Sequence, residues 1–227
     1  MQSKTLIAAI VAHPDDEVLA CGATLAQHVD SGDQVRVLVL ATGGTARADG
    51  SVDVKDILEQ QAQKASEALG VETIEFARFP DNMLDTVPLL NIVQRIEEFL
   101  LKFPAETVYT HHFGDLNIDH QMCHRSVITA LRPKPETKTT TILAGEVLSS
   151  TEWSSSISKP FVPTEFVDIT STLERKLMAM KCYIGELCDW PHPRSIQGIK
   201  TLAQFRGTQC GINCAEAFVT VRRIHRS

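Results

Sequence analysis

The sequence predicts an α/β protein with a Rossmann-like, mainly parallel sheet, helices on both faces of that sheet and an elaborated C-terminal part. Two observations favour this fold class. Short apolar, β-branched runs alternate with helix-patterned segments through residue 144, which is typical of βαβ units. The expected strands are also nearly all apolar, as in a sheet that helices cover on both faces.

Each element of this first part is predicted from its composition and from the residues at its ends. The strands are runs of apolar and β-branched residues. Gly70, Pro104 and Pro133 follow three of the helices, where they act as stop signals. The predicted order is strand 6–11, helix 16–30, strand 35–40, helix 55–69, strand 73–76, helix 87–102, strand 107–110, helix 118–131 and strand 140–144.

The pattern changes after Gly145. Residues 149–158 are polar and are expected to form a loop. We expect a strand over 166–169, helices over 172–184 and 196–205, and a final strand over 217–224. No repeat, low-complexity tract or linker interrupts the sequence, so residues 1–227 are predicted to form a single domain.

Composition and charge narrow the class of protein. Hydrophobic residues make up 43% of the 227 residues and charged residues 22%, which is ordinary for a globular protein. The 28 acidic residues outnumber the 22 Lys and Arg residues. This argues against nucleic acid as a partner, because phosphate binding needs a cationic face. The six cysteines form no CxxC pair, so we expect most of them to be small buried residues in a reducing compartment.

The apolar stretches are too short for a membrane protein. The seven apolar residues 6–12 are at the short limit for a signal peptide, and acidic residues follow at once, so a buried strand explains them better. No stretch approaches the roughly 20 apolar residues of a membrane span. We therefore expect a cytoplasmic protein without a membrane span, and the sequence leaves open whether it is a monomer or a homo-oligomer.

Polar motifs follow the ends of four predicted strands. AHPDDE, residues 12–17, comes directly after the first strand, and Gly43 and Gly44 follow the second. Asp81 follows the third strand, and residues 111–120 follow the fourth. Ligands of open α/β sheets bind beyond the carboxyl ends of the strands, so all four motifs are expected at one edge of the sheet.

His13 and Asp16 are three positions apart across a strand-to-helix turn, which lets both side chains point to one centre. An imidazole with a carboxylate suits Zn²⁺ or another first-row divalent ion such as Fe²⁺. Catalytic zinc takes three protein ligands and leaves one position for water. The candidates for the third ligand lie in residues 110–124, which contain His111, His112, His120 and His124.

Asp15 points away from its neighbour Asp16 and is free to act as a general base. A metal lowers the pKa of a bound water to about 7, and Asp15 would then pass one proton to a leaving group. These parts favour metal-assisted hydrolysis of an amide or an ester. A plainer interpretation is an acidic first helical turn, which the helix macrodipole favours by about 0.3–1 kcal/mol per residue. The histidine-rich stretch shifts the balance toward the metal site.

At these residues the sequence resembles the PIG-L/LmbE family of zinc-dependent N-acetyl sugar deacetylases. The resemblance covers nearly the whole chain. It rests on AHPDDE at 12–17, GDLNIDHQMCH at 114–124 and RGTQCGINCAEAFVTVR at 206–222. It implies that His13, Asp16 and His120 are the metal ligands and that Asp15 is the general base.

The resemblance also implies substrate contacts, with one departure. Arg47 and Asp81 resemble family positions that hold the sugar. Many family members have a histidine three positions before the third ligand, where this chain has Asn117. An amide can donate to an oxyanion, but it cannot carry a proton. The loop WPHPRS, residues 190–195, offers His192 as a catalytic replacement and Arg194 as a substrate contact. The plainer interpretation of this loop is a proline-rich turn that exposes polar residues.

We therefore predict a zinc-dependent amidohydrolase that removes the acetyl group from an N-acetylglucosamine-type sugar or glycoconjugate. The alternative is a non-catalytic, metal-containing sugar-binding protein of the same fold. A structural zinc site is closed by four protein ligands, whereas three are evident here. A nucleotide-binding oxidoreductase would need a GxGxxG turn after the first strand, and the sequence there is AHPDDEVLACGAT.

Overall fold

The computed structural model describes residues 4–44, 52–155 and 159–225 of the chain, and it confirms the predicted α/β fold. The sheet has seven strands in the order β3-β2-β1-β4-β5-β7-β6. The strands are β1 (Leu6–Val11), β2 (Gln34–Ala41), β3 (Thr73–Phe79), β4 (Thr107–His111), β5 (Thr141–Gly145), β6 (Glu165–Asp168) and β7 (Ala215–Arg223). The first five run parallel to one another. β7 pairs antiparallel with β5, and β6 pairs antiparallel with β7, so β6 runs in the same direction as the first five.

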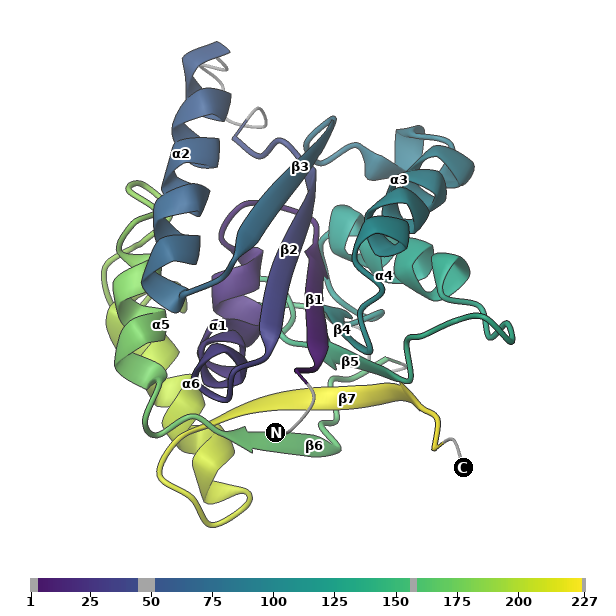
Figure 1. The fold of residues 1–227 in the computed structure, drawn as a ribbon. Helices are drawn as coiled ribbons and strands as arrows, with labels where there is room; N and C mark the ends of the chain where they lie inside the picture. The colour runs from purple at the N-terminus through teal and green to yellow at the C-terminus, as the bar shows by residue number, and fades with distance from the viewer. Residues whose placement is uncertain (1–3, 45–51, 156–158, 226–227) are drawn as a thin grey trace.

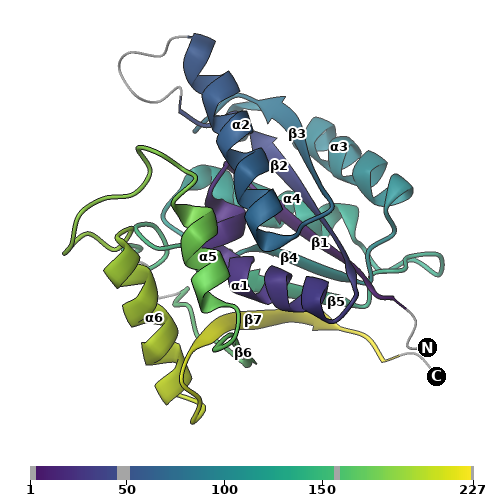
Figure 2. The same ribbon diagram turned by 60° about the vertical axis from the view of Figure 1, so that its left-hand side comes forward.

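Helices cover both faces of the sheet, as Figures 1 and 2 show. One face carries α1 (Asp16–Asp30), α2 (Val52–Leu69), α5 (Leu173–Met180) and α6 (Ile196–Thr208), and the other carries α3 (Leu89–Lys102) and α4 (Ile118–Ala130). Side chains of a strand alternate between the two faces, so β1 contributes to two apolar cores. Ile7, Ala9 and Val11 pack in one core, and Ala8, Ile10 and Ala12 pack in the other.

Most boundaries agree with the sequence-based expectation to within two residues, and four differ by three or four, including the end of α6 at Thr208 instead of residue 205. β3 extends to Phe79 instead of residue 76, and α2 begins at Val52 instead of residue 55. A short 3₁₀ helix, η1 (Leu84–Thr86), precedes α3. The helix expected over 172–184 ends at Met180. The chain then forms turns, which bring the Tyr183 side chain into the core with 0% of its surface exposed.

The order of the strands reverses between β1 and β4, which are parallel neighbours. The chain leaves β1 toward β2 on one side, whereas β4 lies on the other side. Ligand sites of open α/β sheets lie at such switch points, beyond the carboxyl ends of the strands. The turn after β1 and the loop after β4 therefore face each other across this point.

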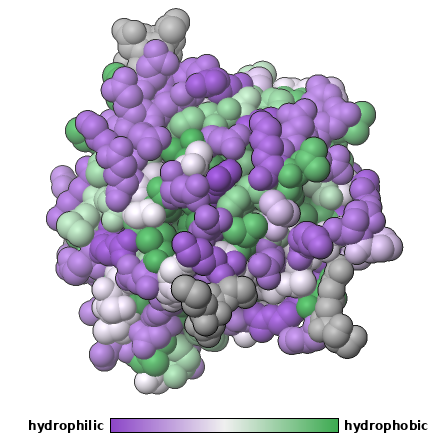
Figure 3. Space-filling model, in the orientation of Figure 1, coloured by the Kyte–Doolittle hydropathy of each residue, from purple (hydrophilic) through white to green (hydrophobic). Residues whose placement is uncertain are grey.

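The face drawn in Figure 3 is mostly hydrophilic, with apolar side chains scattered between the polar ones. Within the described ranges, no helix has the length and apolar character that crossing a bilayer requires.

A buried ion pair ties the C-terminal elements to α1. The Lys176 ammonium lies 2.6 Å from Glu216 Oε1, and both side chains are about 95% buried. The Glu216 carboxylate also accepts hydrogen bonds from the N–H groups of Ala23 and Thr24, while Lys176 donates to the carbonyl of Leu19. The pair thus joins α5 and β7 to the middle of α1, which follows the AHPDDE motif. Glu216 is a structural partner here.

This pair predicts a stability effect. Replacing Lys176 with Met keeps an apolar stem but leaves the Glu216 carboxylate buried without its counter-charge. Removing one partner of a buried pair costs about 3–5 kcal/mol. We expect urea unfolding of Lys176→Met to show a loss of this size.

The control for this prediction is Lys200→Met. Lys200 pairs with Glu174 at 3.3 Å, but both side chains are exposed, and surface pairs contribute about 0–1 kcal/mol. Equal losses of unfolding free energy in the two variants would contradict the structural role of Lys176.

Candidate metal centre and active site

The turn after β1 is closed by its own side chains. Asp16 Oδ2 accepts a hydrogen bond from the backbone N–H of His13 at 2.8 Å. This bond directs the first carboxylate of α1 back toward the end of β1. Across the switch point, Asn117 caps α4, because its Oδ1 accepts a hydrogen bond from the N–H of Asp119 at 2.8 Å. His120 therefore projects from the first turn of α4 toward the same place.

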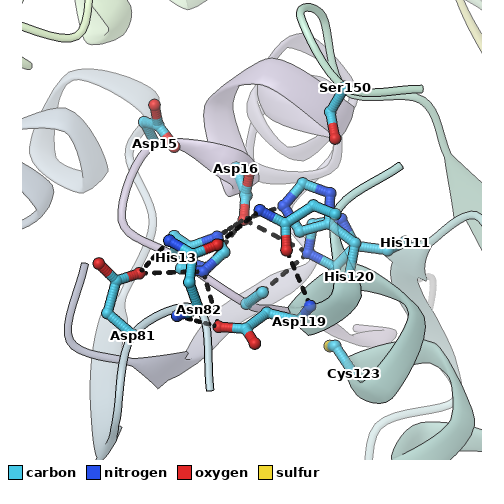
Figure 4. Close-up of polar contacts among 12 residues, drawn as sticks. His13, Asp15, Asp16, Asp81, Asn82, His111, Asp119, His120, Cys123 and Ser150 are labelled. Carbon is cyan, nitrogen blue, oxygen red and sulfur yellow. Dashed lines mark hydrogen bonds and ion pairs between the residues drawn. The ribbon is translucent and has the colours of Figure 1, made fainter. Parts of the chain in front are cut away.

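His13, Asp16 and His120 form a cluster that could hold a metal ion. Each offers one donor atom, and these atoms all lie within 4.8 Å of one another. His13 Nδ1 is 3.2 Å from Asp16 Oδ2, and His120 Nε2 is 3.3 Å from the same oxygen. Figure 4 shows the two rings converging on this carboxylate. Asp16 Oδ1 is buried and has no hydrogen-bond partner among the described residues.

Each histidine of the cluster has a second carboxylate behind it. His13 Nε2 lies 3.0 Å from Asp119 Oδ2, and His120 Nδ1 lies 3.1 Å from Asp115 Oδ1. Histidines that bind metals usually donate their other ring N–H to such a group, which fixes the tautomer and the ring orientation. The arrangement therefore fits a metal site and leaves His13 Nδ1 and His120 Nε2 as the donor atoms.

These carboxylates are themselves held in place. Asp119 accepts hydrogen bonds from the backbone N–H groups of Asn82 and Leu84 at 2.7 and 2.8 Å. Asp115 accepts from the hydroxyls of Ser150 and Thr151. The loop after β3 and the segment after β5 thus support the two histidines through their carboxylates.

The charges around the cluster favour a cation. Burial alone lowers the pKa of His13, but hydrogen bonds to Asp119 and Asp16 outweigh it and raise the pKa to about 10. His120 shows the same balance, and Asp16 and Asp115 raise its pKa to about 9. Burial raises the pKa of Asp16, yet the positive charge of His120 and the hydrogen bonds from His120 and His13 hold it well below its ordinary value. The raised pKa values mean that protons on His13 and His120 balance the charge of the carboxylates. A divalent ion bound between these residues would supply that positive charge instead.

The other three histidines of residues 110–124 have different partners. His111 Nε2 accepts a hydrogen bond from the N–H of Ala12 at 2.8 Å, and its ring stacks on His120 with centroids 3.9 Å apart. Burial lowers the pKa of His111 to about 3, so this ring is neutral. His124 Nδ1 donates to the carbonyl of His111, and His112 Nε2 lies 3.1 Å from the carbonyl of Lys159.

Asp15 lies beside the cluster and faces a different way. Figure 4 shows its side chain directed away from the rings of His13 and His120. Only 2% of its surface is exposed, and Arg194 Nη1 lies 2.8 Å from its Oδ2. Burial raises the pKa of Asp15 well above its ordinary value, and the positive charge of Arg194 opposes this rise.

A polar pocket of about 170 Å³ opens over this site. Its walls bring together His13 of the candidate metal cluster with four other predicted site residues. The lining residues are His13, Pro14, Asp15, Gly43, Gly44, Leu58, Asp81, Asn82, Asn117, Glu186 and Arg194. Asp81 is 6% exposed, and its Oδ1 lies 3.3 Å from His13 Nε2. Carboxylate and amide groups dominate this lining, so the pocket suits a ligand with several hydroxyl or amide groups.

The remaining predicted residues take other positions. The described residues that line the pocket do not include His192, whose ring packs edge-on against Trp153 with centroids 5.6 Å apart. Its Nδ1 accepts a hydrogen bond from the N–H of Arg194. The Arg194 guanidinium bridges Asp15 and Glu186. Arg47 lies outside the described residues.

Sequence reasoning missed the supporting residues. Asp115 and Asp119 lie in the motif GDLNIDHQMCH, residues 114–124. They could have been identified because metal-binding histidines usually donate their second ring N–H to a carboxylate. Asn82, Glu186 and the stacking of His111 on His120 had no comparable signal. They depend on loops that only the fold brings together.

A family model described as PIG-L: GlcNAc-PI de-N-acetylase matches residues 8–131. This match covers more than half of the chain and includes His13, Asp16 and His120. The chain is also similar to the "Uncharacterized deacetylase YaiS" of Escherichia coli K12. The two are 29% identical over 135 residues, which are 57% of this chain and 70% of YaiS.

Solved structures share the fold over nearly the whole chain. The N,N'-diacetylchitobiose deacetylase from Pyrococcus horikoshii superposes with a TM-score of 0.78 at 20% identity, covering 95% of this chain and 83% of that enzyme. GalB from Pseudomonas putida KT2440, a 4-carboxy-2-hydroxymuconate hydratase, has a TM-score of 0.78 at 22% identity, with 99% of both chains covered. At these identities the likeness establishes the fold and not the reaction.

The geometry of the cluster predicts that metal binding requires His120 and is strengthened by Asp115. His120→Ala removes one of three donor atoms, and we expect the purified variant to lose its bound divalent metal. Asp115→Asn keeps all three donors but weakens the support of His120, and such changes typically cost 10–100-fold in metal affinity. Elemental analysis and competition with a chelating dye measure both effects.

His124→Asn provides the matched control. Asparagine can still donate to the carbonyl of His111, and His124 contributes no donor atom to the cluster. We expect full metal content in this variant. A wild-type protein that binds no divalent metal at near-stoichiometric level would contradict the site.

Proposed function

Because the chain belongs to the PIG-L family, a family of deacetylases, we propose that it is a metal-dependent N-deacetylase of an N-acetylated amino sugar, free or within a glycoconjugate. One observation carries the proposal. The cluster of His13, Asp16 and His120 meets, at His13, a polar pocket at the switch point of the sheet that the buried Asp15 also lines. A site with three protein donors suits catalysis, since structural zinc sites are closed by four.

His13, Asp16 and His120 would hold the ion, which we propose to be Zn²⁺ or another first-row divalent ion such as Fe²⁺. When bound, such an ion polarises a carbonyl and lowers the pKa of a coordinated water to about 7. The buried unpartnered oxygen of Asp16 and the carboxylates behind both histidines support this assignment. These features are observed in this chain itself, so the support they give does not rest on similarity to another protein.

Asp15 would move the proton. As the water oxygen bonds to the acetyl carbon, the Asp15 carboxylate accepts a proton from that water. The same proton then passes to the amide nitrogen as the C–N bond breaks, which gives acetate and a free amine. General acid–base catalysis of this kind contributes about 10²–10⁴-fold. Burial, which raises the pKa of Asp15, supports its ability to hold the proton between the two steps.

Pocket residues would orient the sugar. We propose that Asp81 accepts hydrogen bonds from hydroxyl groups, as a carboxylate can from two donors. The Asn117 amide donates to Asn82 Oδ1 at 3.1 Å and has a second N–H that would serve the developing oxyanion. Arg47 remains a proposed sugar contact. We also keep Arg194, whose guanidinium contacts Asp15, as a proposed substrate contact. His192, which lies beside Trp153, remains a proposed catalytic residue.

The proposal predicts the behaviour of Asp15→Asn. The amide keeps the size of the side chain but cannot take a proton from water. We expect deacetylation to fall by about 10²–10⁴-fold, with metal content unchanged. Acetate and free amine released from a panel of N-acetylglucosamine derivatives, with and without a chelator and added Zn²⁺, measure this.

Asp33→Asn is the control. Asp33 pairs with His28 and does not line the pocket, so we expect its activity to match the wild type. Near-full activity in Asp15→Asn would show that another group is the base. A metal-replete wild-type protein that binds N-acetyl sugars but releases no acetate would favour the sugar-binding alternative.

A further inference from the structure

A fully buried pair of polar side chains lies directly behind Asp15. Glu17, in the first turn of α1, and Tyr183, in the turns after α5, are both 0% exposed. The Tyr183 hydroxyl donates a hydrogen bond to Glu17 Oε1. The other oxygen, Glu17 Oε2, accepts a hydrogen bond from the backbone N–H of Asp15 at 3.1 Å. The pair therefore connects a residue far along the chain to the backbone of the proposed base.

The backbone of Asp15 needs such support. Its φ is 102° and its ψ is −28°, a region that residues with a side chain rarely adopt. Such conformations persist only where the surroundings over-determine them, and they concentrate at functional sites. The Asp15 carbonyl is held by the N–H groups of Val18 and Leu19. On the other side of its α-carbon, the N–H is held by Glu17 Oε2.

Two further facts argue for more than core packing. A carboxylate buried beside a tyrosine is costly compared with an apolar pair of the same shape, so core packing alone gives no reason for it. In addition, the segment that carries Tyr183 also carries Arg194, which lies 2.8 Å from the Asp15 carboxylate. Residues 181–195 thus hold Asp15 at its side chain directly and at its backbone through Glu17.

We propose that Tyr183 is a positioning residue for the deacetylation proposed above: acting through Glu17, it fixes the backbone conformation that directs the Asp15 carboxylate into the pocket. The inference rests on that proposed function for its effect on rate. Its structural part, the dependence of the Asp15 conformation on Tyr183, does not require the activity.

Tyr183→Phe removes only the hydroxyl. We expect kcat to fall by about 10–100-fold, since a misplacement of about 1 Å at a reacting group can cost 10²-fold. We expect KM to stay within about twofold of the wild type and the metal content to be unchanged, because no substrate or metal contact is removed. A residue that serves only the core would lower thermal stability without changing kcat.

Tyr109→Phe is the matched control. Tyr109 is the only other tyrosine of the chain, and it is also buried. Its hydroxyl lies 2.9 Å from His28 Nε2 near the end of α1, away from the pocket. This variant loses a comparable buried hydroxyl, and we expect it to keep the wild-type kcat. Equal kcat values in the two variants would overturn the proposal.

A second variant guards against misfolding of Tyr183→Phe. Glu17→Met keeps the length of the side chain but removes both acceptor oxygens, so the N–H of Asp15 and the Tyr183 hydroxyl lose their partner and we expect the same loss of kcat. Full activity in Glu17→Met would overturn the proposal.

A crystal structure of either variant tests the inference even if the wild type releases no acetate from any substrate. We expect Asp15 to leave the conformation near φ 102°. An unchanged Asp15 backbone would overturn the role of Tyr183, whereas an inactive wild type overturns the proposed function alone.

Discussion

The site depends on one buried negative charge, the carboxylate of Asp16. Asp16 is 0% exposed, and its Oδ2 lies 3.2–3.4 Å from ring nitrogens of His13, His111 and His120. A buried charge without compensation is very costly, so this carboxylate requires a cation or a set of donors around it. His111 is neutral and packs against His120 at the edge of the site. The positive charge that balances Asp16 therefore belongs between His13 and His120.

The topology of the sheet supplies that space. β1 and β4 are adjacent and parallel, so the turn before α1 and the loop before α4 end at one edge. Asp16 comes from the first of these connections and His120 from the second. Asp119 then ties the loop after β3 to the same place through Asn82 and Leu84. Three crossovers therefore meet at one cluster, and none of them forms a complete donor set by itself.

Much of this was predictable from sequence, because it depends on local pattern. The apolar strands and the AHPDDE motif after β1 indicated the fold and one half of the cluster. The pattern could not reveal that Arg194 pairs with Asp15 and Glu186. These contacts depend on how the chain runs after Met180, where α5 ends earlier than the pattern suggested. Side-chain partners more than 150 residues apart, such as Asp15 and Arg194, leave no periodic signal.

The fold by itself does not decide the reaction, since a chitobiose deacetylase and a muconate hydratase both share it. In this chain the work is divided between two segments. The three residues of the candidate metal cluster all lie within residues 8–131, which match the family model. The side chains of Tyr183 and Arg194 reach Asp15 from residues 181–195, directly or through Glu17. Changes in the second segment can therefore alter the surroundings of Asp15 while the residues of the candidate metal cluster stay in place. The identity of the reaction is best sought in the surroundings of Asp15, because the metal cluster alone would serve more than one chemistry.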